Sequence, residues 1–388
     1  MAILDGLDQL DWSKLHHAYG PATDVPELLK ALVDPDAASS RLQKSARVDG
    51  RTVRERVLQE LWGNVYHQGS VWPASAKTIP FFVEILRDGP RDAGLRRFVL
   101  SYLSHLAIGY PDDLFPRRVD PNADFKAADG YDDDGSEPEY DDSRRVVSWR
   151  RDCYLAVERA TADLVCFVDA RDQETSLEAI GAVSWFPRQR ETTGPTLLHV
   201  ARLADGLRSG TAIVAAAHLD LPGVIDLALE LCASDDHLLS VHGACAAILC
   251  GTTAPPRGVS AILTSRLGDL ADIRTPLAGT VGILVARCVA LLKQQDEAID
   301  ALIRQLMTTI DARAALSVAA SLLDVILGEA QAPRSAADLT IAQARALYAI
   351  ADHGPFLIDR MSFGNFILLL SSRGLPSSRD GLAAWLAA

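Results

Sequence analysis

The sequence lacks any apolar run of about 18 residues, the length that a helix needs to cross a bilayer, so we expect no membrane span. Its first fifteen residues, MAILDGLDQLDWSKL, are acidic and broken by polar side chains, which argues against a signal peptide or an anchor. The six cysteines form no C-x-x-C pair and lie in apolar text such as VHGACAAILC. They indicate buried free thiols rather than a disulfide framework or a zinc site, and together these absences predict a cytoplasmic protein.

Motifs of common nucleotide-binding and hydrolytic sites are also missing. There is no G-x-S-x-G elbow, P-loop, G-x-G-x-x-G or H-E-x-x-H. The adjacent His16 and His17 would point apart on a helix, and the acidic run from Asp129 does not fit an EF-hand, because Glu137 stands where the loop needs glycine. We therefore expect no metal and no cofactor. An enzyme whose groups come together across repeats stays open, but the sequence indicates no reaction.

Aromatic residues are scarce, at 6% of the chain against 48% hydrophobic residues in which Ala and Leu dominate. This composition favours closely packed helices over an aromatic-rich β-sandwich, and no strand-like alternation competes with the helical spacing of apolar residues. The predicted helices lie near residues 24–32, 53–66, 73–86, 93–108, 145–168, 176–186, 194–204, 210–218, 222–233, 238–250, 258–271, 276–293, 297–310, 312–328, 336–350 and 377–387.

The first secure helix start is DVPELLKAL, in which Asp24 is expected to cap the helix and Glu27 to complete a capping box. The polar stretch DPDAASSRLQKSARVDG that follows predicts a long turn. Further along, Pro80 predicts a kink or a late start in the helix after Trp72.

The helices have short connections and weak self-similarity at about 35 to 45 residues per pair, which predicts an all-α fold, an α-solenoid of antiparallel helix pairs. Residues 1–108 form its N-terminal part, 109–142 an acidic loop insertion, and 143–388 one continuous array. In such folds the concave face is the expected binding surface.

Negative charge is concentrated in one segment. The chain carries a formal charge of −13, and residues 120–142 contain ten acidic residues and one lysine. Such a segment repels phosphate backbones, so nucleic acid is not expected as a partner, whereas a basic protein or a cationic ligand is favoured. A solvated loop without a binding role is the alternative.

The stretch LWGNVYHQGSVWPAS contains most of the candidate binding residues. Arg56, Glu60, Asn64 and His67 recur at helical spacing and form a polar stripe opposite Trp62. His67 and Gln68 offer donors and acceptors, with Tyr66 and Trp72 as flat apolar walls, and Trp185 is a further candidate anchor in AVSWFPRQRE. The structural alternative is that Asn64 and His67 satisfy helix-end carbonyls and that Trp72 and Trp185 fill the core.

Two stretches, LDWSKLHHAYGPATDVPELLKAL and LQELWGNVYHQGSVWPASAKTIPFFVEIL, resemble the N-terminal region of uncharacterised actinobacterial HEAT-repeat proteins. Their L-x-G-N-x-x-H-Q-G helix end corresponds to Leu61, Gly63, Asn64, His67, Gln68 and Gly69. The segment YLAVERATADLVCFVDARDQETSLEAIGAVSWFP is similar to their central repeats. The resemblance implies HEAT-like repeats on both sides of the acidic loop, and binding rather than chemistry. The insertion at 41–51 and the long acidic segment depart from the pattern.

The leading hypothesis is a protein-binding HEAT-repeat scaffold that docks a partner in its concave face. One form of it is an antitoxin-like or immunity role, in which an acidic groove covers a basic effector. The alternative is a small-molecule enzyme or a self-resistance protein of specialised metabolism, with His67 as acid or base in a pocket walled by Trp62, Trp72 and Trp185. A role like that of HEAT-like DNA glycosylases is disfavoured by the charge, although SRRVVSWRRD is a local basic patch.

Overall fold

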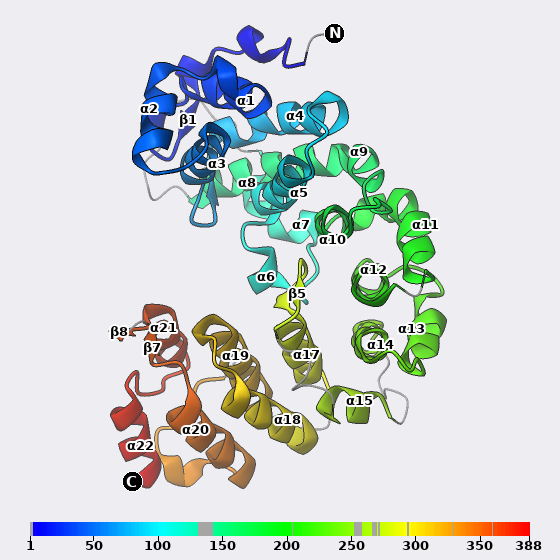
Figure 1. The fold of residues 1–388 in the computed structure, drawn as a ribbon. Helices are drawn as coiled ribbons and strands as arrows, with labels where there is room; N and C mark the ends of the chain where they lie inside the picture. Colours follow the sequence, from blue (N-terminus) through cyan, green and yellow to red (C-terminus); the bar gives the residue numbers. More distant parts are fainter. Residues whose placement is uncertain are drawn as a thin grey trace. The chain divides into compact units, whose positions relative to one another are not determined.

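The computed structural model describes residues 3–130, 143–203, 205–251, 258–265, 270, 272–292, 295–328, 330–358 and 360–388. Within these residues the chain has 21 α-helices and six short 3-10 helices, which confirms the prediction of a mostly helical protein. The chain divides into two compact units, Met1–Val200 (unit 1) and Ala201–Ala388 (unit 2) (Figure 1). No helix in the described part is both long and apolar enough to cross a membrane.

Unit 1 is built from helices that pack in pairs. α1 and α2 each pack against α3, α4 packs against α5, both of these contact α8, and α10 packs against α5. Its elements are, in chain order, η1 (Leu7–Gln9), η2 (Trp12–Lys14), β1 (His16–His17), β2 (Gly20–Pro21), α1 (Val25–Val33), η3 (Pro35–Ala37), α2 (Ser40–Val48), α3 (Val53–Asn64), β3 (Tyr66–His67), β4 (Ser70–Val71), α4 (Pro73–Asp88), α5 (Ala93–Ile108), α6 (Pro111–Leu114), α7 (Pro121–Asp124), η4 (Lys126–Ala128), α8 (Ser143–Arg159), α9 (Thr161–Val165), α10 (Gln173–Val183), η5 (Pro187–Gln189) and α11 (Arg190–Ala201).

Buried tyrosines tie the helices of unit 1 together at their ends. The hydroxyl of Tyr102 donates to the carbonyl of Leu61 at 2.6 Å, and the hydroxyl of Tyr154 donates to the carbonyl of Trp185 at 2.9 Å. A tyrosine fits such a position because its ring fills the core while its hydroxyl donates to a backbone carbonyl oxygen near a helix end.

Unit 2 contains α12 (Gly206–His218), α13 (Val224–Cys232), α14 (His237–Leu249), α15 (Val259–Ser265), β5 (Arg274–Thr275), β6 (Gly279–Thr280), α17 (Val281–Ala290), α18 (Gln295–Thr308), α19 (Ala312–Leu327), η6 (Ala336–Asp338), α20 (Ile341–His353), β7 (Leu357–Ile358), β8 (Met361–Ser362), α21 (Gly364–Ser372) and α22 (Arg379–Ala387). Small residues set its closest contacts. A Cβ atom on Gly243 of α14 would lie 2.7 Å from the carbonyl oxygen of Ala228 in α13. α14 packs in this way against both α12 and α13.

Four short β-hairpins interrupt the described helices, which the sequence did not predict. Strands β1 and β2, β3 and β4, β5 and β6, and β7 and β8 pair with antiparallel register. Each strand has only two residues, too few for a period of two to appear in the sequence. In the second hairpin Tyr66 pairs with Val71 and His67 with Ser70. The motif GNVYHQG therefore forms the end of α3 and a β-hairpin rather than a plain turn between helices.

The turn of this hairpin explains the last two residues of the motif. Gln68 and Gly69 both have positive φ, +49° and +85°, the signature of a type I′ turn. A Cβ atom on Gly69 would also lie 2.5 Å from the ring of Tyr110. Glycine is thus required at 69 both for the backbone conformation and for the packing of Tyr110.

Two local predictions about the N-terminal region are wrong. The polar stretch expected as a turn contains α2, because Ser39 caps it and Leu42 and Ala46 bury one face. Asp24 does not cap α1 with its side chain, because both of its carboxylate oxygens are used in tertiary contacts. Of the two outcomes expected from Pro80, a kink or a late start, the late start does not occur, since α4 begins at Pro73 and continues through Pro80.

The predicted acidic loop is only partly described. Up to residue 130 it contains α6, α7 and η4, whereas residues 131–142, which hold the densest acidic run, lie outside the described residues. The six cysteines are free thiols, as expected. Cys153, Cys245 and Cys288 are buried, but Cys166 is exposed.

Candidate functional site

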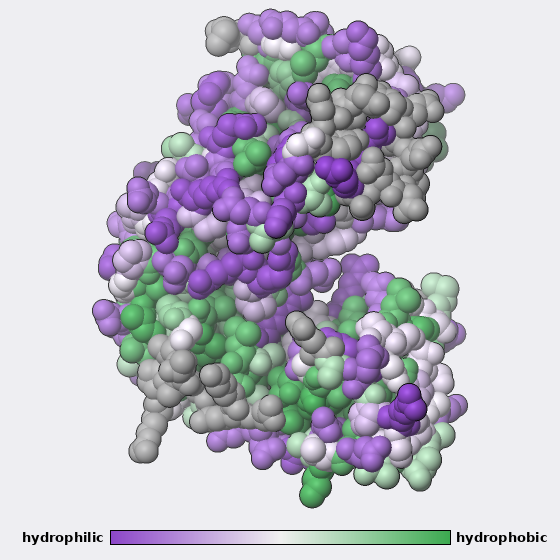
Figure 2. Space-filling model, turned by 180° about the vertical axis from the view of Figure 1, so that it is seen from behind, coloured by the Kyte–Doolittle hydropathy of each residue, from purple (hydrophilic) through white to green (hydrophobic). Residues whose placement is uncertain are grey.

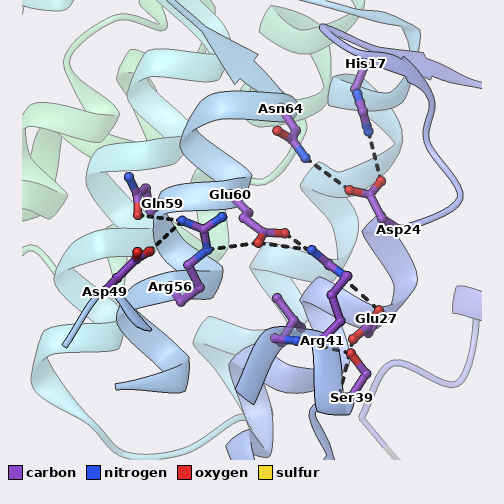
Figure 3. Close-up of polar contacts among 11 residues, drawn as sticks. His17, Asp24, Glu27, Ser39, Arg41, Asp49, Arg56, Gln59, Glu60 and Asn64 are labelled. Atoms are coloured by element: carbon purple, nitrogen blue, oxygen red, sulfur yellow. Dashed lines mark hydrogen bonds and ion pairs between the residues drawn. The ribbon is translucent and has the colours of Figure 1, made fainter. Parts of the chain in front are cut away.

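Arg56 and Glu60, the first half of the predicted polar stripe, are engaged with their own chain (Figure 3). Glu60 accepts hydrogen bonds from Arg56 at 3.0 Å and from both terminal nitrogens of Arg41 at 3.1 and 3.2 Å. Arg56 also donates to Asp49 at 3.0 Å, and Arg41 approaches Glu27. This ion-pair network joins α1, α2 and α3, and each such surface pair contributes about 0 to 1 kcal/mol.

Asn64 and His17 converge on one carboxylate. Asp24 accepts a hydrogen bond from Nδ2 of Asn64 at 3.0 Å and one from Nε2 of His17 at 2.8 Å (Figure 3). Nδ1 of His17 accepts the backbone N–H of Tyr19, which places the ring proton on Nε2. Burial would raise the pKa of Asp24, but the hydrogen bonds from His17 and Asn64 prevail and hold it below its ordinary value. These contacts join the first hairpin, α1 and α3.

His67 and Gln68 lie on the second hairpin. Nδ1 of His67 donates to the carbonyl of Gly63 at 3.0 Å, which satisfies the end of α3. The Tyr19 ring contacts the His67 ring edge-on, at 5.4 Å between centroids. Gln68 is exposed at the tip of the turn. The hydrogen bond of His67 matches the structural alternative, and a role in ligand binding for these residues stays a prediction.

Trp62 and Tyr66 belong to an aromatic cluster between α3 and α5. The Trp62 ring contacts the rings of Tyr66, Phe98, Tyr102 and His105 at centroid distances between 4.9 and 6.1 Å. Trp62 remains 37% exposed, so one side of the cluster reaches the surface. Burial raises the pKa of Tyr66, whose hydroxyl donates to the carbonyl of Gly109.

Trp72 and Trp185 occupy different environments from Trp62. Trp185 is 1% exposed and part of the core. Trp72 lies beside Trp149 of α8, at 5.9 Å between ring centroids, and lines a groove of about 770 Å³. Trp62, Trp185 and His67 are not among the residues that line this groove.

We call this cavity the unit 1 groove. It runs between the N-terminal segment, α4 and α8, which pack side by side. Its lining residues on α4 and α8 recur every three or four positions, so each helix presents one face to it. They are Gly6, Gln9, Leu10, Lys14, Leu15, His16, Trp72, Pro73, Ala76, Lys77, Pro80, Phe81, Trp149, Asp152, Leu155, Ala156 and Arg159.

Cationic side chains dominate the rim of the unit 1 groove. The side chains of Lys77 and Arg159 have no hydrogen-bond or ion-pair partner in the part of the chain that the structure describes, and Lys14 pairs with Asp11 at 3.2 Å. Asp152 is the one acidic residue of the lining, and it lies 3.8 Å from Arg151. The groove therefore favours a ligand with negative charge.

One side-chain group and one backbone group add hydrogen-bonding capacity to the apolar walls of the groove. The indole N–H of Trp72 is buried and has no acceptor among the described residues. Because Pro80 has no N–H, the carbonyl of Ala76 lacks its helical donor, and both residues line the groove. The unit 1 groove thus combines aromatic walls with one indole donor that has no acceptor among the described residues and one carbonyl without its usual helical donor.

The sequence identified only Trp72 of this groove. Lys14 and Lys77 stand alone in the sequence, and Trp149, Asp152, Ala156 and Arg159 follow a helical spacing that also fits an ordinary solvated face. Their convergence depends on the packing of α4 against α8, which no local pattern encodes.

A second titratable group of unit 1 lies outside the groove. Glu178 of α10 is hydrogen-bonded to Ser101 of α5, and burial, together with the nearby charges of Asp112 and Glu174, raises its pKa to about 7. His105 has a lowered pKa because of burial, although its hydrogen bond to the carbonyl of Ser101 opposes the shift. Glu178 is therefore part-protonated near neutral pH.

No protein-family model and no curated protein matches the chain. Among solved structures, the chain is similar to an engineered protein whose crystal structure was determined by the Northeast Structural Genomics Consortium. The two are 16% identical over 90% of this chain and 84% of that one, with a TM-score of 0.26. At that TM-score the likeness supports no conclusion about fold or function, so the HEAT-like resemblance stays a prediction.

Proposed function

We propose that this chain is a protein-binding scaffold of HEAT-like helix pairs, and that the unit 1 groove receives a partner segment carrying apolar side chains next to carboxylates. The observation that carries the proposal is the composition of the groove, in which Trp72, Phe81 and Trp149 form apolar walls below Lys14, Lys77 and Arg159. Aromatic and arginine side chains are the residue types that dominate binding hot spots.

The unpaired groups in the groove favour a peptide over a purely apolar ligand. A bound main chain brings both N–H and C=O groups, which match the Ala76 carbonyl and the Trp72 indole N–H. Acidic side chains of the same segment would pair with Lys77 and Arg159. The lining holds no pair of carboxylates and no nucleophile next to a base, so it favours binding rather than catalysis.

The proposal includes the solenoid arrangement, and the packing of helices in pairs within each unit supports that part of it. An antitoxin-like or immunity role is one form of it, and a basic effector would then bind the acidic segment rather than the groove. The small-molecule alternative centred on His67 draws support only from the ring's half-exposed position, since the Nδ1 bond to Gly63 fixes Nε2 as the free basic nitrogen.

The test is selection from a random peptide display library on the immobilised chain, with Lys77→Ala/Arg159→Ala as the groove variant. The matched control is Lys44→Ala/Arg313→Ala, which removes the same charges from exposed positions outside the groove. We expect enrichment of peptides that combine aspartate or glutamate with aromatic or aliphatic residues, and at least tenfold weaker binding by the groove variant in isothermal titration.

The control variant should bind as the wild type does. Enrichment of basic peptides, or equal binding by both variants in proteins with unchanged melting temperatures, would overturn the proposal.

A further inference from the structure

Unit 2 contains a small pocket where three helices meet. Its volume is about 110 Å³, and it lies at the start of α17, the end of α18 and the beginning of α19. Its lining residues are Asp272, Thr280, Gly282, Ile283, Gln305, Thr308, Thr309, Ile310 and Ala314. We call it the unit 2 pocket.

A buried amide with one unused oxygen belongs to this lining. Gln305 is only 4% exposed, and its Nε2 donates to the carbonyl of Gly282 at 2.7 Å. Its Oε1 is buried and has no hydrogen-bond donor among the residues that the structure describes. An unsatisfied buried acceptor destabilises the protein, and a ligand that supplies a donor here removes that penalty.

The other polar groups of the pocket are also mainly acceptors. The hydroxyls of Thr308 and Thr309 donate to the carbonyl of Gln305, at 3.1 and 2.8 Å, which leaves their lone pairs for a ligand. Both residues lie at the C-terminal end of α18, where the helix dipole is negative. Asp272 adds a negative charge, and none of the described residues that line the pocket is cationic. A compact cation with several donors fits this set.

Apolar side chains complete the pocket beside these oxygens. Ile283 is buried, whereas Ile310 is 99% exposed, so an aliphatic chain that enters would cover it. A volume of about 110 Å³ is about that of three to four water molecules and matches an ammonium group on a short alkyl chain. We propose that the unit 2 pocket binds a primary alkylammonium group, the chemistry shared by a lysine side chain and a free alkylamine.

The experiment titrates n-butylammonium, with n-butanol as the uncharged probe of equal length, into the ¹⁵N-labelled full chain. We expect saturable shifts of the Gly282 amide and the Gln305 side-chain amide, with butanol at least fivefold weaker. Asp272→Asn should weaken n-butylammonium binding at least threefold. The matched control Asp296→Asn, on the exposed first turn of α18, should leave binding unchanged.

A second variant keeps the test informative if one substitution disturbs folding. Thr309→Val should also weaken n-butylammonium binding, with a melting temperature close to that of the wild type. A capped Ala-Lys-Ala peptide tested in parallel separates the two sources: binding like that of n-butylammonium assigns the pocket to a lysine of a partner, and binding of the free amine alone assigns it to a small amine. Equal shifts with butanol, or no saturable shift with either amine, would overturn the proposal, which does not depend on the unit 1 groove.

Discussion

The two units reach stability by different routes. Unit 1 joins its helices with polar and aromatic contacts, such as Asp24 between His17 and Asn64 and the rings around Trp62. Unit 2 brings α12, α13 and α14 together through glycine and alanine, and it exposes more large apolar side chains. Figure 2 shows this contrast, with hydrophobic residues gathered mainly on unit 2 and a mostly hydrophilic face on unit 1. Unit 1 thus depends on specific side-chain contacts between its helices, while close packing in unit 2 leaves little room for added atoms.

The largest expected effect comes from adding one methyl group to unit 2. In Gly243→Ala the new Cβ would lie 2.7 to 3.0 Å from backbone atoms of α13, so we expect a loss of about 3 kcal/mol from overpacking. The counterpart in unit 1 is Gly63→Ala, where no atom lies within 4 Å and the helix should gain about 0.5 to 1 kcal/mol. Hydrogen exchange resolved by peptide measures both. Similar behaviour of the two variants would remove the contrast in packing.

An intermediate effect is expected for the buried acid of unit 1. The pKa of Glu178 is raised from 4.5 to about 7, so the folded state keeps a proton that the unfolded chain releases above pH 4.5. Stability of unit 1 therefore falls as pH rises from about 4.5 to 7, and the full cost remains above pH 7. Glu178→Gln should stabilise the unit by about 2 kcal/mol at pH 8 and have little effect at pH 4.5. Glu191→Gln, at an exposed position of unit 1 away from Glu178, is the control in denaturant titrations.

The smallest effect has the opposite pH dependence and belongs to unit 2. Burial lowers the pKa of His242 from 6.5 to about 4. Below pH 6.5 the unfolded chain therefore binds a proton at this histidine that the folded chain does not bind. Stability of unit 2 should fall as pH drops below 6.5, by about 1 kcal/mol at pH 5.5. His242→Leu should remove this dependence, whereas exposed His237→Leu should not. A protection pattern in which both units weaken in the same direction with pH would contradict the comparison.

Periodicity predicted the long helices because each buries one face. The helix at 93–108 was predicted with the bounds that α5 has, and α19 and α14 within one residue of theirs. Elements with few residues or few apolar side chains were missed. The four hairpins have two-residue strands, and α2 buries only Leu42 and Ala46, so neither gives a periodic signal. α21 was missed as well.

The motif around His67 shows that local sequence does not predict which distant residues a side chain contacts. Its glycine and helix-end groups were recognisable as a local structure, but the partners of each side chain were not. Glu60 pairs with Arg41, Asn64 is hydrogen-bonded to Asp24, and the Trp72 ring lies beside the Trp149 ring. The partners are 19, 40 and 77 residues apart along the chain. Such pairings depend on which helix faces pack, and spacing within one helix carries no information about them.

The sequence by itself determined the helical class, the approximate position of most helices, the free thiols and the glycine-dependent turn, because each follows from interactions between residues close in the chain. Only the tertiary structure decided that Arg56 and Glu60 serve an internal network, that Lys77 and Arg159 converge on one groove, and that the oxygen of Gln305 has no donor among the described residues. Charge and hydrogen-bond satisfaction at these positions are set by neighbours distant in sequence, which local propensity does not specify.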